Sequence, residues 1–357
     1  MTRPAPASPV TRRAALAAGS AGAAAFAAAP FVRASDKAGA KPVTVGSGGH
    51  VYAWDGDWAQ LPDGFAWGNT HGVCQSGDGT IFVCHQAESG PERDVVLAFD
   101  PDGKFLRGWG EEFHGGGHGL DLRDEDGEEF LYLTDLSQPC TVKFTLTGEE
   151  VRRWGKPEGT DQYGPDVRYM ATNVAFTPDG GFFVGDGYGS SFLIRYDAAG
   201  ELVGVFSGKG TEPGELSCPH GLLWDDRPGR EPALAVADRS NNRLSYFDVD
   251  GEFLRVEAAG TVPAPCDLDR RGELAVVPDL DARVTLLDAD DQLVAHLGAT
   301  DASIAKALAD GRALRKQPER WVPGEFVAPH DAAFVNGGDL LIAEWVPTGR
   351  LTYLKRV

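Results

Sequence analysis

The sequence predicts an all-β fold, a six-bladed β-propeller, from three observations. Short apolar stretches alternate with turns along the 357-residue chain, which contains 46 glycines. The turn pattern Asp-x-x-Gly recurs between these stretches, for example at 100–103 and 248–251, because glycine accepts the positive φ that a hairpin turn requires. Six similar segments start 46 to 64 residues apart, near the period of about 40–50 residues expected for a four-stranded blade. The aligned starts are His71, His118, Asn173, His220, Cys266 and His330.

Each repeated segment has the same order of elements. An apolar strand is followed by a turn, a second strand that ends in aspartate, a loop, a third strand, a turn and a fourth strand. The third strand is expected at 192–196 in one segment and at 243–247 in the next.

Two features of the predicted ring depart from the regular repeat: two intervals are longer than the others, and the last segment is one strand short. The long intervals require inserted loops, which we place at 157–168 and at 301–323, the latter partly helical near 302–308. The last segment has only three strands before Val357. A strand from the N-terminal side, near 51–54, is therefore expected to complete the last blade and to cover its open edge.

The first forty residues differ in composition from the rest, so we divide the chain into a signal and linker (1–40) and a propeller (41–357). Arg12 and Arg13 directly precede a stretch at 14–29 that contains only Ala, Gly, Leu, Ser and Phe. This order is typical of a twin-arginine export signal and predicts a periplasmic or extracellular protein. The stretch is shorter than the roughly 20 apolar residues of a membrane-spanning helix, so no stable span is expected after signal removal.

Charge and cysteine content exclude two classes of protein. The formal net charge is −20, whereas phosphate binding requires a basic face, so nucleic acid is not an expected partner. The five cysteines are odd in number and contain no Cys-x-x-Cys pair, which argues against a disulfide framework. The sequence carries no signal for the oligomeric state.

Three histidines occupy every second position among the six aligned starts: His118, His220 and His330. The inner strand of a blade begins beside the central channel, so ring closure brings these side chains to a common centre. Neutral imidazoles offer nitrogen lone pairs without mutual charge repulsion, which is typical of a metal site. The remaining aligned residues, His71, Asn173 and Cys266, are candidates to contact the ligands. His71 could instead be a fourth ligand of the metal.

One segment resembles a known repeat. Residues 237–244, Ala-Asp-Arg-Ser-Asn-Asn-Arg-Leu, look like the signature of NHL repeats. Within that group the chain resembles the lyase domain of peptidylglycine α-amidating enzymes over roughly 50–357. The resemblance implies a six-bladed propeller that holds zinc and calcium. It also implies cleavage of the N–C bond of an α-hydroxyglycine to an amide and glyoxylate, with a small-molecule or peptidyl substrate.

The resemblance assigns roles to individual residues. The zinc histidines of the family fall on His118, His220 and His330. Its calcium would be held by the carboxylate of Asp331 and by the main-chain carbonyls of Leu120 and Val73. The catalytic tyrosine corresponds to Tyr188 in an Asp-Gly-Tyr motif, where it would accept the proton of the substrate hydroxyl, and an active-site arginine corresponds to Arg239.

The chain departs from the family pattern at two positions. A second active-site arginine of the family follows a histidine in the first blade, whereas here His85 is followed by Gln86. Loss of that arginine removes a planar, permanently charged group that could grip a substrate carboxylate. Gln86 becomes a candidate to contact the residues around the metal. A methionine two positions before the last zinc histidine is replaced by Ala328.

Two other functions stay open from the sequence. A non-catalytic NHL propeller could bind a protein or a glycan and use its channel metal only for stability. A fourth protein ligand, His71 or Cys266, would favour that function because it closes the coordination. A calcium-dependent, lactonase-like propeller would need oxygen ligands at the axis, for which Asn173, Asp267 and Asp331 are the candidates.

Overall fold

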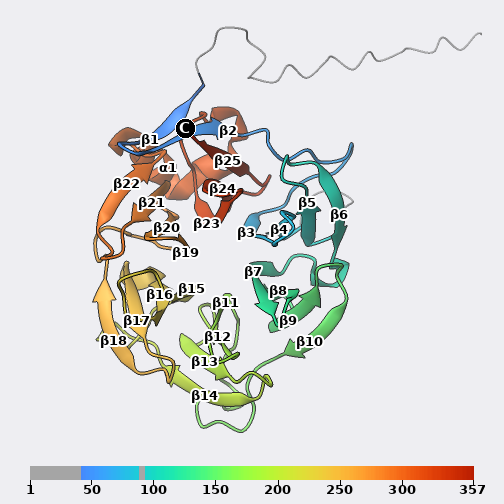
Figure 1. Cartoon of the computed structure of the whole chain (residues 1–357), viewed down its shortest axis with the longest axis vertical. Helices are drawn as coiled ribbons and strands as arrows, with labels where there is room; N and C mark the ends of the chain where they lie inside the picture. The colour runs from blue at the N-terminus through green and yellow to red at the C-terminus, as the bar shows by residue number, and fades with distance from the viewer. Residues whose placement is uncertain (1–41, 88–92) are drawn as a thin grey trace, which may run out of the picture. The chain divides into compact units, whose positions relative to one another are not determined.

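The structure, a computed structural model, describes residues 42–87 and 93–357, so the predicted signal at 1–40 lies outside the described residues. Within them, six β-sheets form a ring, and this confirms the predicted all-β, six-bladed propeller (Figure 1). The innermost strand of each sheet faces the centre of the ring (Figure 1). These inner strands are β3, β7, β11, β15, β19 and β23.

The first three blades each contain four antiparallel strands. The first blade consists of β3 (Thr70–Gln75), β4 (Ile81–His85), β5 (Val96–Phe99) and β6 (Phe105–Trp109). The second consists of β7 (Gly117–Glu125), β8 (Glu128–Asp135), β9 (Cys140–Thr145) and β10 (Glu150–Trp154). The third consists of β11 (Asn173–Phe176), β12 (Phe182–Gly185), β13 (Phe192–Tyr196) and β14 (Leu202–Ser207).

The next two blades repeat this order, and the last is larger. The fourth blade consists of β15 (Pro219–Asp225), β16 (Ala233–Asp238), β17 (Arg243–Phe247) and β18 (Phe253–Glu257). The fifth consists of β19 (Asp269–Arg271), β20 (Leu274–Asp279), β21 (Arg283–Leu287) and β22 (Leu293–Leu297). The sixth combines β23 (Pro329–Val335), β24 (Asp339–Glu344) and β25 (Leu351–Arg356) with β1 (Thr44–Ser47) and β2 (His50–Asp55).

An N-terminal strand closes the ring, as expected for 51–54. β2 pairs antiparallel with β25 from Tyr52 opposite Arg356 to Asp55 opposite Tyr353. The sequence analysis missed β1, which adds a fifth strand outside β2. Covering the edge of β25 in this way leaves its backbone groups paired within the molecule.

The two long intervals contain insertions at the predicted places. The segment at 157–168 contains no helix or strand. The second insertion contains α1 (Asp301–Arg312), followed by the 3₁₀ turns η4 (Ala313–Lys316) and η5 (Pro318–Arg320). Thr300 and Ser303 form a capping box at the start of α1, which satisfies backbone N–H groups that have no partner inside the helix.

The core lies between neighbouring blades, because each sheet buries both of its faces. β4, for example, is a continuous buried run from Ile81 to His85. Phe82 from the first blade packs with Leu133 and Phe144 from the second in one apolar cluster. Burial on both faces explains why these strands read as unbroken apolar stretches rather than as alternating ones.

A polar side chain at the end of the second strand anchors the loop that leads into the inner strand. Asp186, Asp238 and Asp279 accept hydrogen bonds from the backbone N–H groups of Met170, Ser217 and Ala264, at 2.6, 2.7 and 3.1 Å. In the sixth blade Glu344 accepts from Val327 at 2.6 Å. In the first blade Nδ1 of His85 accepts from Gly68 at 3.0 Å. This repeated contact fixes where each inner strand enters the channel.

The fifth blade differs from the aligned pattern. Its inner strand β19 begins at Asp269; before it, Pro265 forms an isolated bridge with Asp279, and the side chain of Asp267 accepts from the N–H of Leu268 at 2.8 Å. All five cysteines are free thiols in the structure. No helix among residues 42–87 and 93–357 is long and apolar enough to cross a membrane.

Candidate functional site

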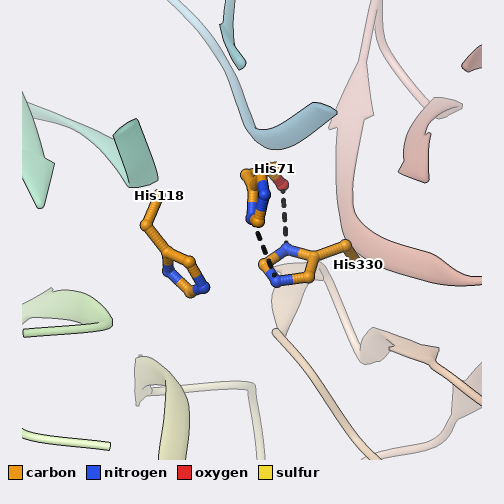
Figure 2. Close-up of side chains that lie close together, drawn as sticks. All are labelled: His71, His118 and His330. Carbon is orange, nitrogen blue, oxygen red and sulfur yellow. Dashed lines mark hydrogen bonds between the residues drawn. The ribbon is translucent and has the colours of Figure 1, made fainter. Parts of the chain in front are cut away.

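Four imidazoles meet at one end of the channel. The ring centroids of His118, His220 and His330 lie 4.7 to 4.8 Å from one another. His71 joins them, with its ring 4.8 Å from that of His118 and 4.3 Å from that of His330 (Figure 2). All four side chains are buried, and each comes from an inner strand of a different blade.

Backbone carbonyls of the next blade orient three of these rings. Nδ1 of His118 lies 2.8 Å from the carbonyl oxygen of Thr172, and Nδ1 of His220 lies 2.7 Å from that of Cys266. Nδ1 of His330 lies 3.3 Å from the carbonyl oxygen of His71 (Figure 2). A carbonyl can only accept, so each Nδ1 carries the proton and each Nε2 keeps its lone pair.

The histidines are neutral because they are buried. Burial lowers the pKa of His118 to about 3. Burial also lowers the pKa of His220 well below its ordinary value, with Arg239 as the next cause, and that of His330, with His71 as the next cause. The imidazoles therefore present lone pairs at any ordinary pH, which is the form that binds metals.

The nitrogen atoms fit a metal ion. His71, His118 and His330 each place a ring nitrogen within 4.8 Å of the other two and could hold a metal. In the described part of the chain, Nε2 of His71 and Nε2 of His118 are buried without a hydrogen-bond partner. A buried lone pair without a donor is costly, and a cation would satisfy it. Nε2 of His220 instead pairs with Tyr188.

Tyr188 and Arg239 form a short chain of hydrogen bonds onto His220. The hydroxyl of Tyr188 lies 2.9 Å from Nε2 of His220, and Nη1 of Arg239 donates to the same hydroxyl at 3.1 Å. Because that Nε2 carries the lone pair, the hydroxyl donates to it. Burial raises the pKa of Tyr188 to about 12, and the positive charge of Arg239 acts in the opposite direction.

Gln86 and Arg315 lie near His71 at the same end of the channel. Burial is the main reason for the lowered pKa of His71; a hydrogen bond with Gln86 acts in the opposite direction, and the charge of Arg315 lowers the pKa further. Arg315, from η4, donates to the backbone carbonyl of Trp345 at 2.6 Å and to Oδ1 of Asn69 at 3.3 Å. Its guanidinium lies 3.0 Å from the centroid of the Trp345 ring.

Sequence reasoning did not single out Arg315. The residue lies inside an insertion, where the repeat gives no register, so its distance from the histidines could not be read from the alignment. The only available signal was the position of the insertion, directly before the segment that leads to His330.

The residues expected to bind calcium follow the histidines on the same inner strands, β3, β7 and β23. Oδ2 of Asp331 accepts from the N–H of Val73 at 2.7 Å. Gly72 lies so close to Leu120 that a Cβ on it would come within 2.7 Å of the Leu120 nitrogen. This close approach brings the backbones around Val73 and Leu120 together. Burial raises the pKa of Asp331 to about 7, while the hydrogen bond from Val73 lowers it.

Beyond the histidines, the inner strands line a cavity of about 890 Å³, whose walls include Val73, Asp121, Asp267, Asp269 and Asp331 but none of the four histidines. Burial raises the pKa of both Asp121 and Asp267 well above the ordinary value, and the charge of Asp331 is the next cause for each. Carboxylate oxygens of this kind are the ligands that calcium prefers.

The side chains of Asn173 and Cys266 were expected to contact the histidines, but among the described residues neither forms a hydrogen bond to an imidazole ring. The amide of Asn173 donates to Asp267 at 3.0 Å and accepts from the N–H of Leu222 at 3.1 Å, so its polar atoms face away from the imidazoles. Cys266 touches His220 through its backbone carbonyl. Burial raises the pKa of its thiol to about 12, so the sulfur stays protonated.

The fold and the channel define a class of protein: a six-bladed β-propeller with buried histidines that could hold a metal at its axis. In sequence it resembles amidating lyases. Over 174 residues it is 32% identical to "Peptidyl-alpha-hydroxyglycine alpha-amidating lyase 1" of Drosophila melanogaster, covering 44% of this chain and 30% of that protein. It is also 26% identical to "Peptidyl-alpha-hydroxyglycine alpha-amidating lyase 2" of Drosophila melanogaster over 276 residues, covering 73% of this chain and 60% of that protein.

Other comparisons extend this picture. The chain is 32% identical to "Peptidylglycine alpha-amidating monooxygenase" of Rattus norvegicus over 187 residues, which cover 49% of this chain but only 18% of the rat protein. No protein-family model matches the chain. A streptogramin B lyase structure matches the fold with a TM-score of 0.56 at 12% identity, covering 85% of this chain and 97% of that one. That likeness concerns the fold alone.

Proposed function

We propose that this protein is a metal-dependent lyase that cleaves the N–C bond of an α-hydroxyglycine-type compound. The observation that carries the proposal is the hydrogen-bonded chain from Arg239 through Tyr188 to His220, because a hydroxyl that could transfer a proton lies directly beside the imidazole cluster. The similarity to proteins named amidating lyases supports the same reaction.

In this proposal His118, His220 and His330 would hold zinc through their Nε2 atoms. Bound zinc would supply a Lewis acid that lowers the pKa of the substrate hydroxyl. Tyr188, in its phenolate form, would accept the hydroxyl proton; the C=O bond of glyoxylate would form as the C–N bond breaks, and the electron pair of that bond would stay on nitrogen. Tyr188 then returns the proton to that nitrogen, which gives a primary amide and glyoxylate with no net proton change.

The surrounding charges decide whether Tyr188 can take part. Burial alone keeps the phenol protonated at neutral pH, because it raises the pKa of Tyr188 to about 12. Arg239 stabilises the phenolate from one side, and a cation at the histidines would stabilise it from the other. The hydroxyl of Tyr188 is hydrogen-bonded to Nε2 of His220, so a cation bound at that nitrogen would free the hydroxyl for the substrate.

A second cation, calcium, is proposed at Asp331 and the carbonyls of Val73 and Leu120. Its role would be to hold the sixth blade against the first two, because these three residues come from β23, β3 and β7. Oxygen ligands of mixed side-chain and main-chain origin suit calcium.

Export by the twin-arginine route is proposed from Arg12, Arg13 and the apolar stretch that follows. Replacing both arginines with lysine should retain the unprocessed chain in the cytoplasm. Fractionation of cells that produce the full chain measures this, and unchanged export of the variant would contradict the proposal.

His71 favours a second candidate function. Its ring lies in the same cluster, and a fourth protein ligand would suit a metal that only stabilises a protein- or glycan-binding propeller. Release of glyoxylate decides between the two candidates.

The purified chain, loaded with zinc, should release glyoxylate from α-hydroxyhippurate. A chelator should abolish the release, and added zinc should restore it. His220→Ala should lose both metal and activity, whereas His296→Ala, a change in the outer strand β22, should keep both. A zinc-loaded protein that releases no glyoxylate from α-hydroxyglycine compounds would contradict the lyase function.

A further inference from the structure

The turn that carries Tyr188 is built around the carboxylate of Asp186. Oδ1 of Asp186 accepts from the backbone N–H of Met170 at 2.6 Å, and Oδ2 accepts from the backbone N–H of Ser190 at 2.7 Å. A Cβ on Gly189 would collide with the same carboxylate, so the turn can close this tightly only with glycine at that position. Tyr188 therefore projects from a turn whose shape depends on one carboxylate.

Three other blades hold the equivalent carboxylate with an arginine that begins or directly precedes the third strand. In the third blade the residue at that place is Phe192, whose carbonyl oxygen accepts from the N–H of Asp186 at 2.9 Å but whose side chain offers no donor. A buried carboxylate needs hydrogen-bond donors, so Asp186 requires one from another segment. The ion pairs of the other blades are Asp238–Arg243 at 2.8 Å, Asp279–Arg283 at 3.8 Å and Glu344–Arg350 at 2.9 Å.

Tyr163, in the insertion at 157–168, supplies this donor. Its hydroxyl donates to Oδ2 of Asp186 at 2.7 Å, and its buried ring lies edge-on to that of Phe192, with the centroids 5.3 Å apart. Burial raises the pKa of Tyr163 far above its ordinary value, and the charge of Asp186 acts in the same direction. The phenol therefore keeps its proton and remains a donor, where the other three blades use a guanidinium.

Two further contacts join the turn to the same stretch of chain. Oγ of Ser190 donates to the carbonyl oxygen of Arg168 at 2.8 Å, and the N–H of Tyr188 donates to the carbonyl oxygen of Met170 at 3.4 Å. The turn is thus bonded to the insertion and to the residues directly after it on both sides of Tyr188. A shift of this stretch would shift the phenol of Tyr188 relative to the histidines.

We propose that the insertion at 157–168 supports the turn of Tyr188, and that Tyr163 is a positioning residue that holds the Tyr188 hydroxyl at the histidine cluster through Asp186. The catalytic consequence of this inference rests on the proposed function, in which Tyr188 transfers the proton. It adds a residue, and a role for the insertion, that the proposed function does not contain.

Tyr163→Phe tests the inference because it removes one oxygen and keeps the ring. We expect kcat for glyoxylate release from α-hydroxyhippurate to fall by about 10- to 100-fold, since a displacement of about 1 Å at a reacting group costs up to 10²-fold. KM and zinc content should not change. Tyr169→Phe is the matched control, because Tyr169 is buried in the same apolar cluster and its hydroxyl has no hydrogen-bond partner among the described residues. It should retain the wild-type kcat.

A double-mutant cycle shows whether Tyr163 acts through Tyr188. In the Tyr188→Phe background, Tyr163→Phe should have little further effect on kcat, because residues that act as one unit are not additive. A purely structural role would instead lower kcat by the same factor in both backgrounds. That result, or an unchanged kcat in the single variant, would overturn the positioning role.

A measurement without turnover separates this inference from the proposed function. In the purified chain with ¹³C-labelled tyrosine, the NMR signal of Tyr188, assigned with Tyr188→Phe, should shift in Tyr163→Phe and stay in place in Tyr169→Phe. If the wild-type chain releases no glyoxylate, the lyase proposal falls, and this signal still decides whether Tyr163 positions Tyr188. An unmoved signal overturns the inference and leaves the lyase proposal standing.

Ser190→Ala provides a second variant should Tyr163→Phe fail to fold. It removes the contact with Arg168 at the edge of the turn and leaves the backbone N–H that Asp186 accepts. A shifted Tyr188 signal in this variant would support the role of the insertion, and an unmoved signal would overturn it.

Discussion

The carboxylate of Asp331 and the backbone N–H of Val73 form a hydrogen bond of 2.7 Å that joins the sixth blade to the first. Asp331 directly follows His330, so the contact that closes the ring also fixes the height of one imidazole in the channel. Closure of the fold and assembly of the site therefore depend on the same few atoms.

This relationship predicts that calcium stabilises the wild-type chain through Asp331. Thermal unfolding should shift upward when calcium is added, by the equivalent of about 2.7 kcal/mol at a concentration 100-fold above the dissociation constant. Asp331→Asn should remove most of the shift, because the amide has lost the charge that attracts the cation. A shift of equal size in the variant would place the calcium elsewhere.

Tyr188→Phe should keep the metal and lose turnover. The phenyl ring preserves the packing against His118 and His220, while the proton-transfer group is gone. We expect kcat for glyoxylate release to fall by about 10²- to 10⁴-fold, as is usual for a lost acid or base. Metal analysis and steady-state kinetics measure this, with Tyr353→Phe in β25 as the control. Retained turnover would remove Tyr188 from the mechanism.

Arg315→Ala should weaken the binding of substrates that carry a carboxylate. The guanidinium lies near His71 and is held in place by Trp345 and Asn69, so it is a preorganised cation beside the histidine cluster. Loss of a charge-assisted hydrogen bond predicts a KM about 10- to 100-fold higher, with metal content unchanged. Arg320→Ala, an exposed change in the same insertion, is the control. An unchanged KM would show that Arg315 has only a packing role.

Asp279 predicts a pH dependence of stability that is independent of any metal. Burial raises the pKa of Asp279 from 3.8 to about 6, although the backbone hydrogen bond from Ala264 opposes this. Between these values the folded chain holds a proton that the unfolded chain has released. The contribution is therefore fully present below about pH 4 and is lost as the pH rises through 6.

The size of this effect is at most about 3 kcal/mol, because each unit of the pKa shift from 3.8 to about 6 is worth roughly 1.4 kcal/mol. Urea unfolding of wild type and Asp279→Asn between pH 4 and pH 7 measures it, and the free energy of unfolding should fall less steeply in the variant. Asp290→Asn, a change in an exposed turn, should retain the wild-type slope. Identical slopes in all three proteins would refute the prediction.

Local patterns in the sequence determined much of the fold. Turn residues and apolar runs placed β13 and β17 at 192–196 and 243–247, because hairpin turns depend on residues next to one another in the chain. The unpaired third strand of the last blade predicted closure by the N-terminal side, because an open edge is costly. The strand β1 was missed, because the N-terminal strand expected near 51–54 already completed the four strands of the last blade.

The candidate site was accessible from the sequence only in outline. The repeat placed His71, His118, His220 and His330 at equivalent positions, and ring geometry then implied that they meet. It could not give the direction of each ring, which depends on the carbonyls of Thr172 and Cys266 in neighbouring blades. It also could not give the orientation of Asn173, whose amide turns toward Asp267.

The sequence by itself determined the number of blades, the means of closure and the histidines that face the axis, because each follows from spacing along the chain. Only the tertiary structure decided that Nδ1 of His71 lies 3.3 Å from Nε2 of His330, that the hydroxyl of Tyr188 bonds His220, and that Arg315 bonds Asn69 close to His71. Those relationships join residues that are up to 259 positions apart. Their distances are set by how whole blades pack against one another, which no local pattern encodes.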